Sequence, residues 1–356
     1  MNNELILAVA GSRKTQGIIE HCAKLDAQKR VLVLTFTQFN QNEIRNRLSH
    51  YAGNSSNVEV LGWYTFLIRH FAKPFLPYKF PGHRILGFNF DGRPYMMAKG
   101  INRFLDKNHY AYACELARLS AELITASQGA LIFRLESIYD EILIDEVQDL
   151  SGYDLDILDS LLATIINLKM VGDMRQAVLS TNPRGSKHKK YHNTKMLSWF
   201  LEREEKGTIK ITEKFTTWRC HHLISDYADT IFSPDWEFPK TKSENHTVSC
   251  HDGVFLVLKE HVEDYIKAFK PQCLRNSKSS GKAYNFDFIN FKASKGSTFE
   301  RILIIPTSGI EAFIQKNDYL ESTAAATFYV AVTRAQQSVA IVVGKPGQSN
   351  LPIWMP

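Results

Sequence analysis

Short apolar runs rich in β-branched residues alternate with longer amphipathic stretches along most of the chain. A buried parallel strand is typically such a continuous run, and an amphipathic helix follows it in a βα unit. The runs that predict strands in the first part of the chain lie near residues 4–9, 31–36, 58–61, 141–145 and 168–172. Those in the second part lie near 209–212, 253–258, 287–291, 301–306 and 338–343. The pattern predicts an α/β fold with two doubly wound parallel-sheet lobes.

The alternation stops between residues 71 and 137. Prolines mark an irregular lead-in near 74–82, and residues 98–105 and 110–130 are expected to be helical, the latter because leucines recur along one face. A small helical insertion is therefore expected within the first lobe. The predicted domains are a first lobe over 1–70 and 138–205, the insertion over 71–137, and a second lobe over 206–356.

Residues 8–15 read Ala-Val-Ala-Gly-Ser-Arg-Lys-Thr and join the first predicted strand to a helix expected over residues 16–24. A loop of small residues at a helix N-terminus turns backbone N–H groups toward an anion, which predicts a phosphate cradle. In such a cradle Lys14 contacts the β- and γ-phosphates, and the Thr15 hydroxyl is a ligand of Mg²⁺. Taken alone, the loop also fits an ordinary strand–turn–helix with a surface lysine.

A second candidate group follows the apolar run Ile142-Leu143-Ile144, which ends in Asp145 and Glu146. Ligands of open α/β sheets bind at the carboxyl ends of the strands, where these two acids are expected to lie. Asp145 is placed to hold the Mg²⁺ shell, and Glu146 is placed to orient and deprotonate an attacking water. An acidic pair after a strand is common, but its continuation as Val147-Gln148-Asp149 is far less so.

With these motifs, the chain resembles superfamily 1 helicases of the UvrD/Rep/PcrA type, in shortened form. The segments that carry the resemblance, in chain order, are 8–15, 31–37 with 43–47, 62–66, 145–149, 171–176, 217–220, 292–300 and 328–335. The resemblance implies two RecA-like lobes with ATP held between them. It also implies that Gln176 senses the γ-phosphate, that Arg219 touches it, and that Arg334 acts as an arginine finger.

The cofactors that the resemblance implies are ATP and Mg²⁺. The residues that it predicts for nucleotide binding are Ala10, Gly11, Ser12, Arg13, Lys14, Thr15, Trp218 and Gly296, with the Trp218 ring stacking on the base. Its predicted catalytic residues are Lys14, Glu146, Gln176, Arg219 and Arg334, and its predicted metal ligands are Thr15 and Asp145.

Nucleic acid, as single-stranded or partly unwound DNA, is the partner that the resemblance implies. The residues predicted to contact it are Thr35, Phe36, Thr37, Tyr64, Lys187, Lys189 and Lys190. The lysines lie in a basic stretch at 183–192, which fits a solvated loop equally well. The formal net charge of +6 and the isoelectric point near 8.9 permit a polyanionic partner without requiring one.

The remaining composition is that of a globular protein, with 44% hydrophobic and 22% charged residues. The five cysteines are scattered, which favours reduced thiols over a disulfide framework or a zinc site. No apolar run approaches the roughly 18 residues needed to cross a bilayer, and no signal-like leader stands at the N-terminus. A cytoplasmic location is therefore expected, with no membrane partner.

Three departures from the family pattern stand out. The interval from Arg219 to Lys292 is too short for the family's second accessory domain. Arg13 replaces the glycine that precedes the cradle lysine, and Thr298 replaces a glutamate expected to bind the ribose. Residues 177–181 lack the aromatic rings on which the family stacks bases, and such stacking contributes about 1–3 kcal/mol per base.

Two functions are compatible with these observations. The first is a nucleic-acid-responsive ATPase that moves on or remodels DNA. The alternative is an ATP-sensing, helicase-like regulatory subunit of a nuclease complex, with little or no unwinding. The architecture of that alternative is similar to the helicase-like partners of OLD-family nucleases in Gabija-type anti-phage systems. A pseudo-ATPase that only binds DNA is disfavoured because every predicted charged catalytic position is occupied.

Overall fold

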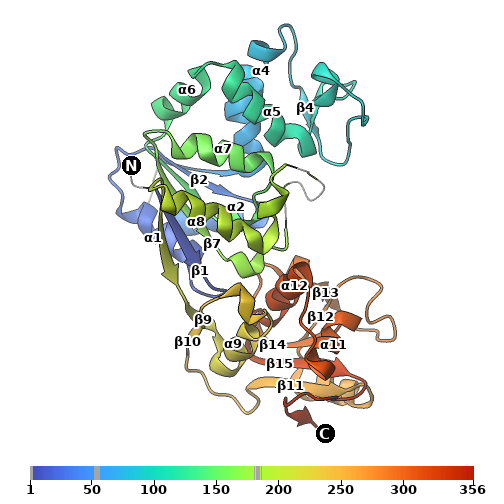
Figure 1. Ribbon diagram of the computed structural model, residues 1–356. Helices are drawn as coiled ribbons and strands as arrows, with labels where there is room; N and C mark the ends of the chain where they lie inside the picture. Colours follow the sequence, from blue (N-terminus) through green and yellow to red (C-terminus); the bar gives the residue numbers. More distant parts are fainter. Residues whose placement is uncertain (1–2, 52–56, 180, 182–184, 186) are drawn as a thin grey trace. The chain divides into compact units, whose positions relative to one another are not determined.

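The computed structural model describes residues 3–51, 57–179, 181, 185 and 187–356 (Figure 1). The chain folds into two compact units. Unit 1 comprises Met1–Leu7, Lys14–Gly172 and Ser180–Thr212. Unit 2 comprises Ala8–Arg13, Asp173–Leu179 and Glu213–Pro356. No helix in the described ranges has both the length and the apolar character that crossing a bilayer requires.

Unit 1 is built on a six-stranded sheet with the order β3-β2-β6-β7-β1-β8. Its strands are β1 (Glu4–Ala8), β2 (Val31–Thr35), β3 (Val58–Gly62), β6 (Glu141–Ile144), β7 (Asn167–Gly172) and β8 (Lys210–Lys214). The neighbouring strands from β3 through β1 pair in parallel. β2 and β6 are buried along their whole length, which explains why they are continuous apolar runs rather than alternating ones.

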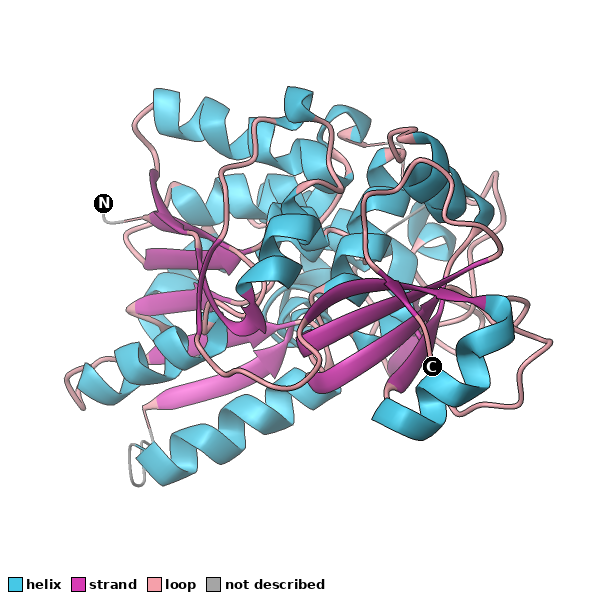
Figure 2. Ribbon diagram, turned by 90° about the horizontal axis from the view of Figure 1, so that it is seen from below, coloured by secondary structure: helices cyan, strands magenta, loops and turns pink. Residues whose placement is uncertain are grey.

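Helices pack on both faces of the unit 1 sheet (Figure 2). The helices of unit 1 are α1 (Lys14–Lys24), α2 (Gln38–Tyr51), α3 (Trp63–Phe66), a π-helix (Leu67–Ala72), α4 (Lys73–Lys79), α5 (Ala113–Ala126), α6 (Ala130–Ile138), α7 (Tyr153–Leu162) and α8 (Met196–Glu205). Short 3₁₀ turns cover Gly100–Arg103, Val147–Asp149, Lys189–Tyr191 and Asn193–Lys195. On one face, Ile18 and Ile19 of α1 and Ile44 of α2 pack against Val33 and Leu143 of the sheet.

The inserted segment corrects two sequence-based predictions. Residues 98–105 form only a 3₁₀ turn, because Gly100 takes a left-handed conformation (φ 57°) through which an α-helix cannot run. Residues 110–130 do not begin as a helix. Tyr110–Tyr112 is a strand, β5, which pairs in parallel with β4 (Gly87–Asn89), and α5 starts only at Ala113. The apolar spacing alone did not reveal this strand pair.

Unit 2 contains a second six-stranded sheet with the order β13-β12-β14-β15-β11-β16, and every neighbouring pair is parallel. Its strands are β11 (Gly253–Leu258), β12 (Gln272–Arg275), β13 (Phe288–Asn290), β14 (Phe299–Ile305), β15 (Ala335–Val343) and β16 (Ile353–Trp354). A separate parallel pair joins β9 (Thr216–His221) and β10 (Lys242–Asn245). The α/β class with two parallel sheets is thereby confirmed.

Four α-helices accompany the unit 2 sheet. They are α9 (His222–Asp229), α10 (Val262–Phe269), α11 (Ser308–Lys316) and α12 (Ser322–Val332). The 3₁₀ turns of this unit are Met174–Gln176, Pro234–Trp236, Lys259–His261 and Phe291–Ser294. From Ala325 to its end, α12 is buried on all sides within the core of the unit, which accounts for its apolar composition. The strand expected near 209–212 is β8, and it belongs to the sheet of unit 1.

Candidate nucleotide site

The carboxyl edge of the unit 1 sheet brings together the two predicted metal ligands. β6 ends at Ile144, and the Asp145 N–H still donates to the Leu34 carbonyl of β2, 2.9 Å away. α1 begins at Lys14, next to Thr15. The Thr15 hydroxyl donates to an Asp145 carboxylate oxygen at 3.1 Å, and the Asp145 side chain is fully buried. A strand end and a helix start, 130 residues apart, thus place both oxygens in one spot.

Two carboxylates, those of Asp145 and Glu146, influence each other at this sheet edge. Burial raises the pKa of Asp145 most strongly, and the neighbouring Glu146 carboxylate raises it further. The Lys14 ammonium and the Thr15 hydroxyl oppose this shift. A bound cation would favour the charged form of Asp145 in the same way that Lys14 does.

The donor set fits Mg²⁺. A hydroxyl and a carboxylate are hard oxygen donors, and Mg²⁺ usually completes its octahedron with waters and substrate phosphates rather than with further side chains. Within the described ranges no cluster of three or more His, Cys, Asp or Glu side chains could hold a metal. Together with a nucleotide, Thr15 and Asp145 would hold Mg²⁺.

Glu146, the predicted general base, has a strained backbone. Its φ of 57° lies in the left-handed region, which a non-glycine residue adopts at a cost of order 1–3 kcal/mol. The backbone N–H of Glu146 donates to the Asp145 carboxylate at 3.0 Å. The side-chain amide of Gln148 donates to the Glu146 carboxylate. The backbone of Gly172 lies close to the Gln148 side chain, since a Cβ on Gly172 would lie 2.6 Å from the Gln148 amide oxygen. The surrounding packing holds the carboxylate of Glu146 in one direction.

The loop at residues 8–13 belongs to unit 2 and is held by β9. Gly11 has φ 74°, and a Cβ there would lie 2.5 Å from the Thr217 hydroxyl and 2.6 Å from the Arg219 Cβ. The Trp218 N–H donates to the Gly11 carbonyl at 2.9 Å. Only glycine fits this close approach. The neighbouring Ser12 hydroxyl is buried and makes no hydrogen bond to another described residue, so it remains a donor for a ligand oxygen.

Arg13 is placed against a predicted base-binding ring. Its φ is 61°, again in the left-handed region, and its guanidinium lies 4.1 Å from the centre of the Trp218 ring. This distance is typical of a cation–π contact. The Trp218 side chain is 46% exposed. In unit 2 the guanidinium thus covers a face of the ring that the resemblance assigns to the base of ATP.

Three predicted catalytic groups meet within unit 2. A terminal nitrogen of Arg334 donates to the Gln176 amide oxygen at 3.3 Å, and Arg334 also donates to the Val330 and Ser297 carbonyls at 2.9 and 3.3 Å. Arg219 donates to the Thr333 carbonyl at 3.0 Å, one residue before Arg334. The predicted nucleotide-binding Gly296 (φ 92°) directly precedes Ser297. The described hydrogen bonds of both guanidinium groups therefore end on neutral oxygens.

The first group of predicted nucleic-acid contacts lies at the carboxyl end of β2. Thr35 is buried, and its hydroxyl makes no hydrogen bond to another residue that the structure describes. Phe36 is half-buried. Thr37 is exposed and its hydroxyl accepts the Asn40 N–H at 3.1 Å, which caps α2. This cap is enough to explain where Thr37 lies, without a nucleic-acid ligand.

The predicted lysines are partly neutralised by acids. Lys187 lies 3.5 Å from Asp156, and Lys190 lies 3.6 Å from Glu202, while Lys189 is exposed. Residues 183, 184 and 186 of this predicted basic stretch lie outside the described residues.

A polar network around Asp154 was not anticipated from the sequence. Its buried carboxylate accepts hydrogen bonds from the Trp63 indole at 2.8 Å, from the Ser151 N–H at 3.2 Å and from the Thr181 hydroxyl. The Tyr64 hydroxyl donates to the Thr181 carbonyl at 3.0 Å. Burial raises the pKa of Asp154 to about 6 despite these donors. The network ties the motif at residues 62–66 to the start of α7 and to Thr181, and only an acid at a helix start hinted at it in the sequence.

Comparison with known proteins gives one family match. The model of the UvrD/REP helicase N-terminal domain matches residues 93–196, a segment that contains Asp145, Glu146 and Gln176. This segment is similar to UvrD-like superfamily 1 helicases. None of the curated proteins compared matches the chain.

Among solved structures, the chain is similar to two structures of an Arterivirus helicase. The crystal structure of Arterivirus nonstructural protein 10 (helicase) is 14% identical, with a TM-score of 0.48, and the match covers 96% of this chain and 59% of that one. The complex of the same helicase with DNA gives 15% identity, a TM-score of 0.47, and coverage of 96% and 61%. The chain thus spans about three fifths of the length of these structures.

Proposed function

We propose that this chain is a nucleic-acid-responsive ATPase of the UvrD-like helicase type. The observation that carries the proposal is the hydrogen bond of 3.1 Å between Thr15 and the buried Asp145. It joins a helix start that follows a small-residue loop to an acidic strand end, as phosphoryl transfer with Mg²⁺ requires. The match of residues 93–196 to the UvrD/REP helicase N-terminal domain supports the same reading.

Each group has a chemical task in this proposal. Lys14 neutralises charge on the phosphates, while Thr15 and Asp145 would hold Mg²⁺, which would supply further positive charge beside the phosphate oxygens. Glu146 orients a water and takes its proton as that water attacks the γ-phosphorus, and the bond to the ADP oxygen breaks. The products are ADP and inorganic phosphate.

The groups of unit 2 act on the γ-phosphate and the base. Arg219 and Arg334 stabilise negative charge on the transferred group, and Gln176, hydrogen-bonded to Arg334, senses its presence. Trp218 stacks on the base. Hydrolysis would then drive movement on, or remodelling of, DNA.

The test is steady-state release of phosphate from Mg²⁺-ATP by the full chain, with and without single-stranded oligo(dT). The proposal expects turnover that rises several-fold when the oligonucleotide is added. Turnover that is absent under both conditions would contradict it. A strand-displacement assay on a tailed duplex then asks whether hydrolysis is coupled to unwinding.

A regulatory subunit of a nuclease complex is the second candidate, in the manner of a Gabija-type anti-phage system. The observation that favours it is that Ala177 and Val178, where relatives present stacking rings, are small and buried. Steady turnover that ignores oligo(dT) and changes only with an added nuclease subunit would favour this candidate over the first.

A further inference from the structure

An aromatic pair with one exposed ring lies on the inserted segment of unit 1. The Phe90 side chain is 64% exposed and stacks on Phe88, with ring centres 5.0 Å apart and planes 26° apart. Its ring also meets the Tyr64 ring edge to face, at 6.1 Å and 84°. Tyr64 is a predicted nucleic-acid contact, so the pair extends a predicted binding surface with a second ring.

The turn that presents Phe90 is fixed by side-chain hydrogen bonds. The Asn89 amide donates to Asp106 at 2.8 Å and its oxygen accepts the Gly92 N–H at 2.7 Å. The Cys114 thiol approaches the Gly92 carbonyl at 3.9 Å, which anchors the turn to α5. A ring that is exposed yet held in place loses little conformational freedom when a ligand stacks on it.

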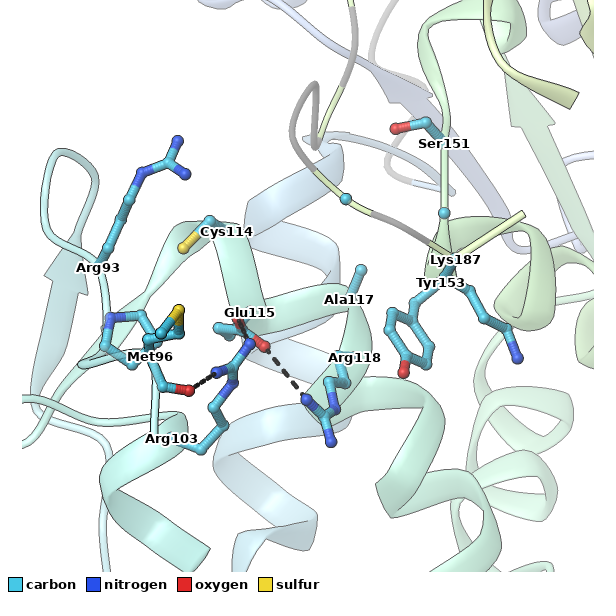
Figure 3. Close-up of a pocket in the computed structure, with 13 residues that line it drawn as sticks. Arg93, Met96, Arg103, Cys114, Glu115, Ala117, Arg118, Ser151, Tyr153 and Lys187 are labelled. Atoms are coloured by element: carbon cyan, nitrogen blue, oxygen red, sulfur yellow. Dashed lines mark hydrogen bonds and ion pairs between the residues drawn. The ribbon is translucent and has the colours of Figure 1, made fainter. Parts of the chain in front are cut away.

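A cationic cavity of about 340 Å³ begins where this turn ends (Figure 3). The charged side chains that line it are Arg93, Arg103, Arg118, Lys187 and, as the one carboxylate among them, Glu115. In Figure 3 Arg103 and Arg118 both point toward Glu115, and Lys187 lies beside Tyr153. Arg118 also pairs with Glu122 and Lys187 with Asp156, and neither acid lines the cavity, so the excess positive charge rests on Arg93.

Two of these cations have unused binding capacity. Arg93 is exposed and forms no ion pair with any residue that the structure describes. Arg103 is bonded to Glu115 at 2.7 Å, but its buried Nε makes no hydrogen bond within the described part of the chain. An anion in the cavity would accept from the guanidinium group beside which it lies.

The aromatic pair and the cavity are continuous. Asp91 separates Phe90 from Gly92 and Arg93 in the chain, and Cys114 contacts Gly92 while lining the cavity. A ligand with a flat ring next to an anionic group could thus occupy both places.

We propose that this surface binds single-stranded nucleic acid, with a base stacked on Phe90 and the adjacent phosphodiester in the cavity beside Arg93 and Arg103. The proposal rests on the function proposed above and specifies where the strand binds. Phe90 would supply the stacking surface that residues 177–181 lack. A rigid ring beside an anion-binding cavity is the combination that proteins use for single strands. The positive charge of Arg93 favours this ligand over a protein segment.

The test is fluorescence anisotropy of labelled oligo(dT) and oligo(rU) of equal length, titrated with the full chain over a range of salt concentrations. Phe90→Ala should weaken binding roughly 5- to 150-fold, as expected for one lost stacked base, without changing the salt dependence. Arg93→Gln should reduce the slope of log K against log salt by about 0.7, as expected for one lost phosphate contact. Arg93 is chosen because its loss leaves no carboxylate unpaired.

Matched controls separate this surface from general effects. Phe133→Ala removes another exposed ring (71% exposed) on α6, and Lys24→Gln removes an exposed cation on α1. Both should bind like the parent chain, and melting curves should show all four variants folded.

The outcomes also separate this proposal from the function on which it rests. If oligo(dT) binds the parent and stimulates its ATPase, but Phe90→Ala and Arg93→Gln bind like the parent, this surface is not the binding site and the proposed function stands. If the parent neither binds nor responds to either oligonucleotide, both proposals fail. Loss of binding in Phe133→Ala equal to that in Phe90→Ala would also overturn the assignment.

Discussion

The charged side chains that are predicted to be functional are mainly acidic in unit 1 and basic in unit 2. At the sheet edge of unit 1, Asp145 is wholly buried and Glu146 lies beside it, with Lys14 as the nearby cation. In unit 2, Arg334 is almost fully buried and Arg219 half-buried, and their described hydrogen bonds go to carbonyl and amide oxygens. The carboxylates of unit 1 thus suit a metal cation, and the guanidinium groups of unit 2 suit phosphate oxygens.

Another arginine of unit 2 shows the contrasting, structural arrangement. Arg175 is also buried, but it forms ion pairs with Asp229 at 2.8 Å and Asp173 at 3.7 Å and lies over the Tyr329 ring. An arginine paired in this way has its charge compensated inside the fold. The following variants test whether these two groups of charged side chains take part in the reaction proposed above.

The largest effect is expected for Arg334→Gln. An arginine that stabilises the transferred phosphoryl group accounts for about 10³–10⁵ in kcat, so turnover should fall within that range. Stopped or quenched-flow measurement of phosphate release checks it. Arg301→Gln, which changes a partly buried arginine outside the predicted site, is the matched control and should keep kcat. If Arg334→Gln kept the kcat of the parent chain, Arg334 of unit 2 would not take part in the chemical step.

A somewhat smaller loss is expected for Glu146→Gln. The amide keeps the shape of the side chain but cannot take a proton, so kcat should fall by about 10²–10⁴ while ATP still binds. Binding of a fluorescent ATP analogue, measured beside turnover, separates the two steps. Glu20→Gln on the exposed side of α1 serves as the control. Turnover at the parent rate would show that Glu146 is not the base.

Lys14→Ala should act mainly on binding. Removing a charge-assisted contact to phosphate costs about 1.5–3 kcal/mol, or roughly 10- to 150-fold in the Kd of Mg²⁺-ATP. Isothermal titration calorimetry measures this, with Lys24→Ala at the other end of the same helix as the control. If both variants bind ATP like the parent, the cation of unit 1 does not contact the nucleotide.

The smallest effect is expected for Arg13→Gly. Glycine adopts φ 61° without the strain that arginine suffers, and its lack of a side chain uncovers the Trp218 ring. A relief of about 1 kcal/mol would raise nucleotide affinity or turnover roughly fivefold. Steady-state kinetics decide between this and the opposite result, a higher KM, which would mean that Arg13 contacts the phosphates. Unchanged kcat and KM would make Arg13 a bystander.

The sequence predicted those parts of the molecule that depend on local order. A strand end followed by two acids and a small-residue loop followed by Lys14 both have local signatures, and parallel strands bring such edges together. The pairing of Thr15 with Asp145 could therefore be anticipated. The α/β class followed from the same alternation of runs.

The features that the sequence did not predict depend on tertiary contacts. The Phe90 ring contacts the rings of Tyr64 and Phe88, and the turn that places it there has no periodic sequence pattern. The left-handed Gly100 interrupts a helix that apolar spacing favours, since spacing carries no information on φ. The contact of Arg13 with Trp218 joins residues 205 positions apart, and no local signal encodes it.

The most direct test of the account is phosphate release from Mg²⁺-ATP by the purified parent chain in the presence of oligo(dT), measured beside Glu146→Gln. The account predicts turnover in the parent that requires Mg²⁺, falls when oligo(dT) is left out, and is lost in the variant. Equal release by both proteins, or none by the parent with the oligonucleotide present, would contradict it.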